Sequence, residues 1–226
     1  AVNIAYQVAR HGSPSLFLSM EMPEQELADR LIAQSGSVFL SAVLAGDMEG
    51  DNGDRIMYGV SILENLPLVI DDQGGLTLFD VASKARSVKR KHGLELLVLD
   101  YLQLMSGDGD NRNQQIEQIT RGLKALAKEL DIPIIALSQL SRKCEERTNK
   151  RPMNSDLRES GAIEQDADII MFIYRDDYYN KDSKEPNVAE VIIGKQRNGP
   201  TGTVKLYFQK NQTRFENLAL GASNDV

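Results

Sequence analysis

Five short, strongly apolar runs constrain the fold of this chain more than any other feature. Each has five or six residues, is rich in Leu, Ile or Val, does not alternate with polar residues, and is bounded by turn residues. Such runs are typical of strands that are buried on both faces. The five runs are Ser15–Met20, Leu66–Ile70, Leu94–Leu99, Ile132–Leu137 and Ile169–Tyr174.

Apolar residues at helical spacing lie between these runs and predict helices over Leu78–Val88 and Ile116–Leu130. Strands that alternate with helices form βαβ units, so we expect an α/β fold with a mostly parallel, twisted sheet flanked by helices. The end of the chain differs, because its β-rich segments predict antiparallel hairpins appended to the sheet. These segments are Ala189–Ile193, Thr203–Tyr207 and Thr213–Leu218.

The first residues predict a helix that no strand precedes. Apolar residues from Val2 to Ala9 lie at helical spacing and lead into a Gly- and Pro-containing turn. The chain starts at Ala1 with neither an initiator Met nor an N-cap residue. We therefore expect a segment of the protein upstream of this helix.

Length and cysteine content restrict the class of protein. The 226 residues suffice for one large α/β domain, and the longest apolar run is far shorter than the ~20 residues of a membrane helix. Cys144 is the only cysteine, so no disulfide framework is possible. A reducing, cytosolic setting fits best.

The net charge of −7 argues against a nucleic-acid partner only when it is taken as one number. Residues 142–158 carry six basic and three acidic side chains, and residues 191–215 carry five basic side chains and no acid. The rest of the chain therefore sums to −15. Charge alone leaves two alternatives open, solvated loops or two functional basic stretches on an acidic body.

Polar side chains follow four of the apolar runs. They are Glu21, Asp71 with Asp72, Asp100, and Ser138 with Gln139. The carboxyl ends of parallel strands meet at one edge of a sheet, where ligands bind. Carboxylates and an amide at that edge suit a metal–phosphate site, although polar residues at strand ends also bond the following turn.

Asp100 matches the Walker B pattern, in which an apolar strand ends in an Asp that holds Mg²⁺ at a nucleotide. The partner motif is the phosphate loop G-x-x-x-x-G-K-S/T between a strand and a helix. No such motif occurs in the 226 residues. Because the chain opens inside a helix, the expected upstream segment has the shape of a phosphate loop and its strand.

From Ala1 to about Leu218 the sequence resembles the C-terminal, RecA-like motor domain of DnaB-type bacterial replicative helicases. The motifs that carry this resemblance are SMEMP at Ser19–Pro23, LLVLDYLQLM at Leu96–Met105, IIALSQLSR at Ile134–Arg142, RPMNSDLRESGAIEQDAD at Arg151–Asp168 and IIGKQRNGPTGTV at Ile192–Val204. The resemblance implies a RecA-like P-loop NTPase fold over residues 1–220, truncated before the Walker A motif. Residues 221–226, at the end of the chain, are expected to form a disordered tail.

The resemblance assigns roles at the nucleotide edge. It makes Glu21 the catalytic carboxylate that polarises the attacking water, a role for which positioning and electrostatics suffice. It makes Asp100 the Mg²⁺-binding aspartate and Gln139 a sensor between the γ-phosphate and DNA-binding loops. The alternatives are that Glu21 caps the helix near Pro23 and that Gln139 only bonds main-chain groups.

The same resemblance assigns roles to the basic stretches. Arg197 becomes an arginine finger that reaches the γ-phosphate held by a neighbouring subunit, with Lys195 beside it. Arg158, Glu159 and Gly161 match positions that contact the backbone of single-stranded DNA. No aromatic residue lies in that loop, so binding by base stacking is not expected. The alternatives are that Lys195 and Arg197 lie on a solvated edge and that the first stretch is a helix N-terminus that happens to be basic.

The implied protein is an ATP-hydrolysing DNA helicase that uses ATP and Mg²⁺. It is a homohexamer that moves 5′ to 3′ on single-stranded DNA at cytoplasmic replication forks, with a helicase loader and primase as partners. The 226 residues alone are expected to be inactive as an ATPase. Two alternatives remain: a RecA-like ATPase of the recombination or circadian-clock type, and a module that only binds nucleic acid or protein.

Overall fold

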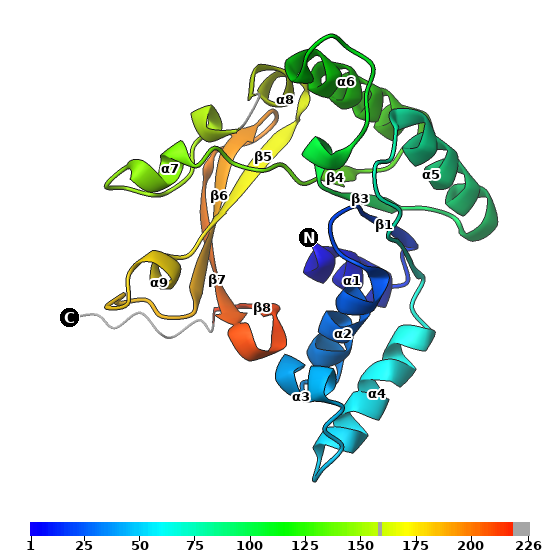
Figure 1. Ribbon diagram of the computed structural model, residues 1–226, viewed down its shortest axis with the longest axis vertical. Helices are drawn as coiled ribbons and strands as arrows, with labels where there is room; N and C mark the ends of the chain where they lie inside the picture. Colours follow the sequence, from blue (N-terminus) through cyan, green and yellow to red (C-terminus); the bar gives the residue numbers. More distant parts are fainter. Residues whose placement is uncertain (158–159, 219–226) are drawn as a thin grey trace.

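The computed structural model describes residues 1–157 and 160–218, which form two four-stranded sheets with helices around them. Figure 1 shows the first sheet on one side of the molecule and the second sheet on the other. The first sheet follows the early apolar runs, and the second follows the hairpin segments near the end of the chain.

The first sheet is parallel and has the strand order β2-β1-β3-β4. Its strands are β1 (Ser15–Ser19), β2 (Leu68–Asp71), β3 (Leu96–Asp100) and β4 (Ile134–Ala136). Strand β1 is buried throughout and β3 almost throughout, as expected for central strands covered on both faces. The edge strands β2 and β4 are only partly covered.

Two apolar clusters cover the two faces of this sheet. Leu97 and Leu99 lie in the larger cluster with α5 (Leu78–His92) and α6 (Arg112–Leu130), which confirms both predicted helices. Leu96 and Val98 lie in the smaller cluster with α1 (Val2–Arg10) and α2 (Glu24–Ser35). The helix predicted at the start of the chain is therefore present.

Local sequence sets where the long helices begin. Thr77 and Asp80 form a reciprocal capping box at the start of α5, and the side chain of Asn111 accepts from the N–H of Gln114 at the start of α6. Two further helices, α3 (Leu40–Ala45) and α4 (Asn52–Glu64), follow α2. The apolar spacing did not predict these two, since α3 is short and α4 has few buried residues.

The second sheet is antiparallel and has the order β5-β6-β7-β8. Its strands are β5 (Ile169–Tyr174), β6 (Val188–Gln196), β7 (Gly202–Gln209) and β8 (Arg214–Asn217), which confirms the predicted hairpins. The prediction for the fifth apolar run was wrong in one respect. Strand β5 alternates between exposed and buried residues and joins this antiparallel sheet instead of the parallel one.

The exposed face of β5 explains that error. Ile170, Phe172 and Tyr174 point into the core, whereas Ile169, Met171 and Ile173 are about half exposed. A strand with apolar residues on both faces is expected to be buried on both faces. In β5 the described residues bury one face and leave the other exposed. Strand β5 is also the end of its sheet, as β4 is the end of the first sheet, so each has one edge that no other described strand pairs with.

Short elements connect the long ones: η1 (Leu102–Leu104), α7 (Lys143–Glu146), η2 (Asn154–Asp156), α8 (Ser160–Asp166), α9 (Asp176–Tyr179) and η3 (Lys210–Gln212). The tail predicted over residues 221–226 lies outside the described residues. In the described part of the chain, no helix has the length and apolar character needed to cross a membrane.

Candidate functional site

The ends of β1 and β3 bring Glu21 and Asp100 together. Ser19 is the register partner of Asp100, and the N–H of Met20 donates to the carbonyl oxygen of Asp100 at 2.8 Å. Burial raises the pKa of the Asp100 carboxyl, and the charge of Glu21 raises it further. Two carboxylates therefore share one edge at an electrostatic cost.

The alternative that Glu21 caps the following helix is not what the structure shows. Helix α2 has no side-chain cap at its N-cap residue, Pro23. The first N–H of the helix, from Glu24, donates instead to Oδ2 of Asp72 at 2.9 Å. Asp72 thus satisfies the start of α2, and its neighbour Asp71 pairs with Lys84 at 2.5 Å. Glu21 is exposed, so its carboxylate is accessible to a ligand.

Gln139 lies at the same edge, three residues after β4. The N–H of Leu137 donates to the carbonyl oxygen of Leu99 at 2.8 Å, which holds the end of β4 against β3. The side chain of Gln103 fixes the next turn: its Oε1 accepts from the N–H of Gln139 at 3.1 Å. Its Nε2 donates to Oγ of Ser138 at 3.0 Å.

Gln103 is a residue that sequence reasoning missed. The one feature of the sequence that could have indicated it is that Gln103 is a single amide residue in the apolar stretch after Asp100, where the one-turn element η1 forms. The bonds that it makes leave the side chain of Gln139 exposed. The main chain of Gln139 is thus fixed while its side-chain amide remains accessible to a ligand.

The donor set at this edge fits Mg²⁺ that is shared with a phosphate ligand. Among the described residues, no group of three His, Cys, Asp or Glu side chains is placed to hold a metal ion by itself. Mg²⁺ commonly takes one or two carboxylates and completes its octahedron with water and substrate phosphates. Asp100, with Glu21 beside it, supplies that kind of partial site.

Lys195 and Arg197 lie at the far end of β6. Nη1 of Arg197 is 3.1 Å from Oδ1 of Asp168. Nζ of Lys195 donates to the carbonyl oxygens of Glu164 and Gln165 at the end of α8. No ion pair or hydrogen bond among the described residues joins either cation to Glu21 or Asp100. The cations and the carboxylate edge are therefore separate groups within this chain.

Two of the three residues predicted to contact DNA, Arg158 and Glu159, lie outside the described residues. The third, Gly161, is exposed in the first turn of α8, where an added Cβ would meet no atom of the described residues within 4 Å. The preceding segment is anchored in the fold, because Arg147 binds both oxygens of the buried Asp156 at 2.8 and 2.6 Å.

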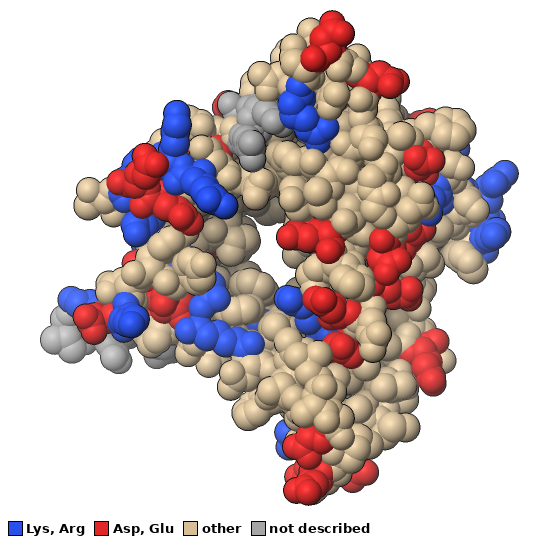
Figure 2. Space-filling model, viewed as in Figure 1, with Lys and Arg blue, Asp and Glu red and all other residues tan. Residues whose placement is uncertain are grey.

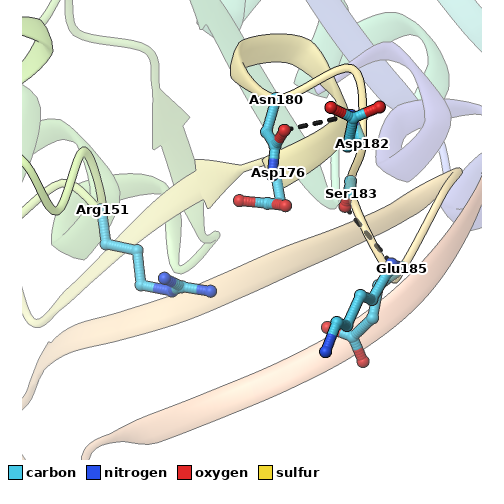
Figure 3. A pocket seen from close by; sticks show the side chains of 7 residues that line it. Arg151, Asp176, Asn180, Asp182, Ser183 and Glu185 are labelled. Atoms are coloured by element: carbon cyan, nitrogen blue, oxygen red, sulfur yellow. Dashed lines mark hydrogen bonds between the residues drawn. The ribbon is translucent and has the colours of Figure 1, made fainter.

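A polar cavity of about 320 Å³ lies near α9 and is lined by Arg151, Asp176, Asn180, Asp182, Ser183, Lys184 and Glu185 (Figure 3). Its main polar groups already have partners. Arg151 binds the buried Glu190 at 2.6 and 2.8 Å, and Asp176 accepts from the hydroxyl of Tyr174 at 3.0 Å. This cavity belongs to the scaffold of the second sheet and contains none of the predicted site residues.

The surface charge is unevenly placed. Figure 2 shows Lys and Arg atoms gathered on the left of the view, where Figure 1 places α7 and α9, and many Asp and Glu atoms on the right. A further basic run, Lys84 to Lys91 on α5, has five cations and no acid and was not predicted. Its cations are largely used within the fold: Lys84 pairs with Asp71, and Arg86 with Glu129.

An open parallel sheet with this strand order, and with Glu21, Asp100 and Gln139 at its carboxyl edge, is that of the RecA-like α/β domains. The model of the DnaB-like helicase C-terminal domain matches residues 1–217. The chain belongs to this family.

Known relatives and solved structures support the same family assignment. The chain is 46% identical over 222 residues to "Replicative DNA helicase DnaB" of Geobacillus stearothermophilus, covering 96% of the chain and 49% of that protein. It is 49% identical over 225 residues to the protein of the same name from Pasteurella multocida, covering 97% and 48%. One solved structure, described as an ATPase domain, superposes with a TM-score of 0.92 at 43% identity, covering 96% of this chain and 78% of that one.

A structure of a DnaB-like replicative helicase, solved to describe its interactions with primase, also gives a TM-score of 0.92 at 43% identity, with 96% and 55% of the two chains covered. The chain spans about half the length of the curated relatives it matches. The family match confirms the resemblance and the α/β fold class predicted from the motifs, and it favours neither a recombination nor a clock ATPase.

Proposed function

We propose that this chain is the motor domain of a longer replicative DNA helicase that hydrolyses ATP and moves 5′ to 3′ along one DNA strand as a homohexamer. The relatives that support this proposal are named replicative DNA helicases and match the chain over almost its whole length. The observation that carries it is the pairing of Glu21 and Asp100 at the ends of β1 and β3.

In this proposal Asp100 holds Mg²⁺ and Glu21 orients the attacking water. Bound Mg²⁺ neutralises charge on the nucleotide phosphates. Glu21 is exposed beside a carboxylate whose pKa burial raises, so a cation at Asp100 relieves the repulsion between them. Gln139, fixed through Gln103, completes the edge as the group that senses the γ-phosphate.

A phosphate loop is required as well, and no G-x-x-x-x-G-K-S/T motif occurs in these 226 residues. We place it in the half of the longer protein that the chain does not span. The unpaired edges of β4 and β5, and the opening that Figure 2 shows in the molecule, are consistent with an additional strand between the two sheets. On its own, the 226-residue chain neither hydrolyses ATP nor unwinds DNA.

Arg197, with Lys195 beside it, acts on the phosphate bound by a neighbouring subunit, since neither cation contacts the carboxylate edge of its own chain.

Large apolar side chains on and around α3 and α4 support self-association, since a neighbour that covers them removes apolar surface from water. Phe39, Leu44, Met48, Met57 and Tyr58 are 53–64% exposed.

Single-stranded DNA binds at Arg158, Glu159 and Gly161 through its backbone, without base stacking. The exposed main chain at Gly161 supports this placement because it leaves room for a phosphate. A helicase loader and primase are the protein partners, and the protein acts in the cytoplasm at replication forks. The structural relative described with primase supports the last partner.

The test is made in the full-length protein with Glu21→Gln. Loss of the water-orienting carboxylate lowers kcat for ATP hydrolysis about 10²- to 10⁴-fold, while the affinity for ATP is retained. Glu24→Gln, an equal charge change at an exposed residue of α2, is the matched control and leaves kcat unchanged. Equal activity of the two variants would exclude Glu21 as the catalytic carboxylate.

A further inference from the structure

Asp168, directly before β5, is the carboxylate that pairs with Arg197 at the end of β6. It pairs with Lys124 of α6 on one oxygen and with Arg197 on the other, at 3.1 Å. The hydrogen bond from Lys124 lowers the pKa of Asp168, and the charges of Lys124, Arg197 and Lys195 lower it further, against an opposing effect of burial. The aspartate is therefore held ionised among three cations.

Asp168 also fixes the main chain of Arg197. The N–H of Arg197 donates to the carbonyl oxygen of Asp168 at 2.9 Å, next to the register pair Ile169 and Gln196. One residue thus anchors both the backbone and the guanidinium of Arg197. Because the backbone bond places the start of the side chain and the ion pair holds its end, Arg197 has less rotamer freedom than an unpaired surface arginine.

The charges do not cancel within this group. Lys124 and Arg197 share the single carboxylate of Asp168, which leaves a net charge of +1 for these three side chains. Lys195 lies near enough for its charge to lower the pKa of Asp168 as well, but it donates to main-chain carbonyls. Lys124 offsets the aspartate, so the positive charge of Arg197 stays available to another anion. The guanidinium remains reachable, since the side chain of Arg197 is 53% exposed.

We propose that Asp168 is the positioning residue for Arg197: it orients the guanidinium toward the phosphate of a neighbouring subunit, and Lys124 prevents the aspartate from neutralising it. This inference rests on the proposed function, in which Arg197 acts in trans. A guanidinium that is already oriented loses little conformational entropy when it contacts the transition state. The orientation therefore raises kcat and does not tighten the binding of ATP.

The experiment uses the full-length hexamer and measures DNA-stimulated ATP hydrolysis at varied ATP for Asp168→Asn, Arg197→Ala and the double variant. We expect Asp168→Asn to lower kcat about tenfold with little change in KM for ATP, since the interaction acts in the transition state. In the Arg197→Ala background, Asp168→Asn has no further effect, because there is no guanidinium left to orient.

The matched control is Glu185→Gln. It removes an ion pair of 2.5 Å between the turn before β6 and Lys205 of β7, whose exposure is similar to that of the Arg197–Asp168 pair. If Arg197→Ala is inactive whereas Asp168→Asn behaves like Glu185→Gln, the inference on Asp168 is wrong and the proposed function stands. If Arg197→Ala keeps full activity, the trans role and the inference are both wrong.

A second variant covers the case in which Asp168→Asn does not assemble into hexamers. Asp168→Glu keeps the charge but lengthens the side chain by one methylene, which displaces the guanidinium. We expect a several-fold lower kcat with an unchanged KM for ATP and unchanged hexamer assembly by light scattering. A kcat equal to that of the unaltered protein overturns the inference.

Discussion

The main-chain N–H of Ser141 donates to the carbonyl oxygen of Asp156 at 2.7 Å. The neighbouring residues Leu140 and Leu157 form an antiparallel bridge. Gln139, at the carboxyl edge of the first sheet, is therefore only two residues from the first contact, and Arg158 follows directly after the bridge. A short, hydrogen-bonded connection thus joins the proposed sensor of the nucleotide to the segment proposed to contact DNA.

We predict that Asp156→Ala destabilises the protein by about 2–3 kcal/mol, because hydrogen bonds to a buried charged group are among the stronger ones. The carboxylate is buried and accepts from two nitrogens of Arg147 and from the N–H of Met153 at 2.9 Å. The measurement is the free energy of unfolding in urea.

The control for this prediction is Glu129→Ala. Glu129 also binds an arginine through two hydrogen bonds, Arg86 at 2.7 Å each, but both side chains are nearly half exposed. Exposed ion pairs contribute little to stability. If Glu129→Ala lowered the free energy of unfolding as much as Asp156→Ala does, burial would not be the reason for the contribution of the Arg147–Asp156 pair to stability.

Apolar runs predicted the parallel sheet because β1 and β3 are covered on both faces by helices of the same chain. The same kind of run gave a wrong prediction for β5. Its residues are apolar on both faces of the strand, but the described residues bury only one of these faces. The pairing of Glu21 with Asp100 was predictable from strand ends, because parallel strands fix which residues share an edge.

The supporting residues were not predictable in this way. Gln103 acts through bonds to Ser138 and to the main chain of Gln139, and Asp168 through an ion pair to a residue 29 positions later in the chain. Neither contact follows a helical or strand period, so only the folded chain reveals them. The same holds for Asp72, which satisfies the start of α2 from another strand end.

A second prediction concerns the packing of α2 on α4. A Cβ at Gly36 would lie 2.2 Å from the main-chain oxygen of Arg55, and backbone cannot move aside as a side-chain end can. We expect Gly36→Ala to cost about 1–3 kcal/mol, as overpacking typically does. Gly202→Ala is the control, since an added Cβ there meets no atom within 4 Å. Urea unfolding of both variants makes the comparison; equal stability would contradict the close approach.

A third prediction follows from the raised pKa of Asp100. A carboxyl whose pKa is higher in the folded than in the unfolded state binds more protons when folded, so stability falls as pH rises through the folded pKa. The ionised carboxylate beside Glu21 therefore destabilises the metal-free protein at neutral pH. Asp100→Asn removes this effect.

We expect Asp100→Asn to raise the melting temperature at pH 7 in the presence of a chelator. The gain shrinks as the pH falls and is absent below the unfolded pKa of an aspartate, about 4. Thermal unfolding between pH 4 and 8 checks this. A melting temperature that drops at pH 7, or a gain that grows toward acid, would contradict the repulsion between Asp100 and Glu21.

The last prediction separates DNA binding from stability at Gly161. In the first turn of α8, an alanine meets no atom within 4 Å and improves the helix, so we expect unfolding free energy to be equal or higher by up to about 1 kcal/mol. If a DNA phosphate approaches the main chain here, the added methyl group weakens binding of single-stranded DNA by the full-length hexamer about tenfold, that is, by about 1.4 kcal/mol.

Salt dependence identifies the cause of that loss. Gly161→Ala removes no charge, so the slope of log affinity against log salt stays the same, whereas Arg158→Ala reduces the slope by about one phosphate contact. Fluorescence anisotropy with labelled single-stranded DNA at several salt concentrations measures both. Unchanged affinity of Gly161→Ala at every salt concentration would mean that DNA does not approach the start of α8, and the proposed DNA contact would have to be placed elsewhere in the second half of the chain.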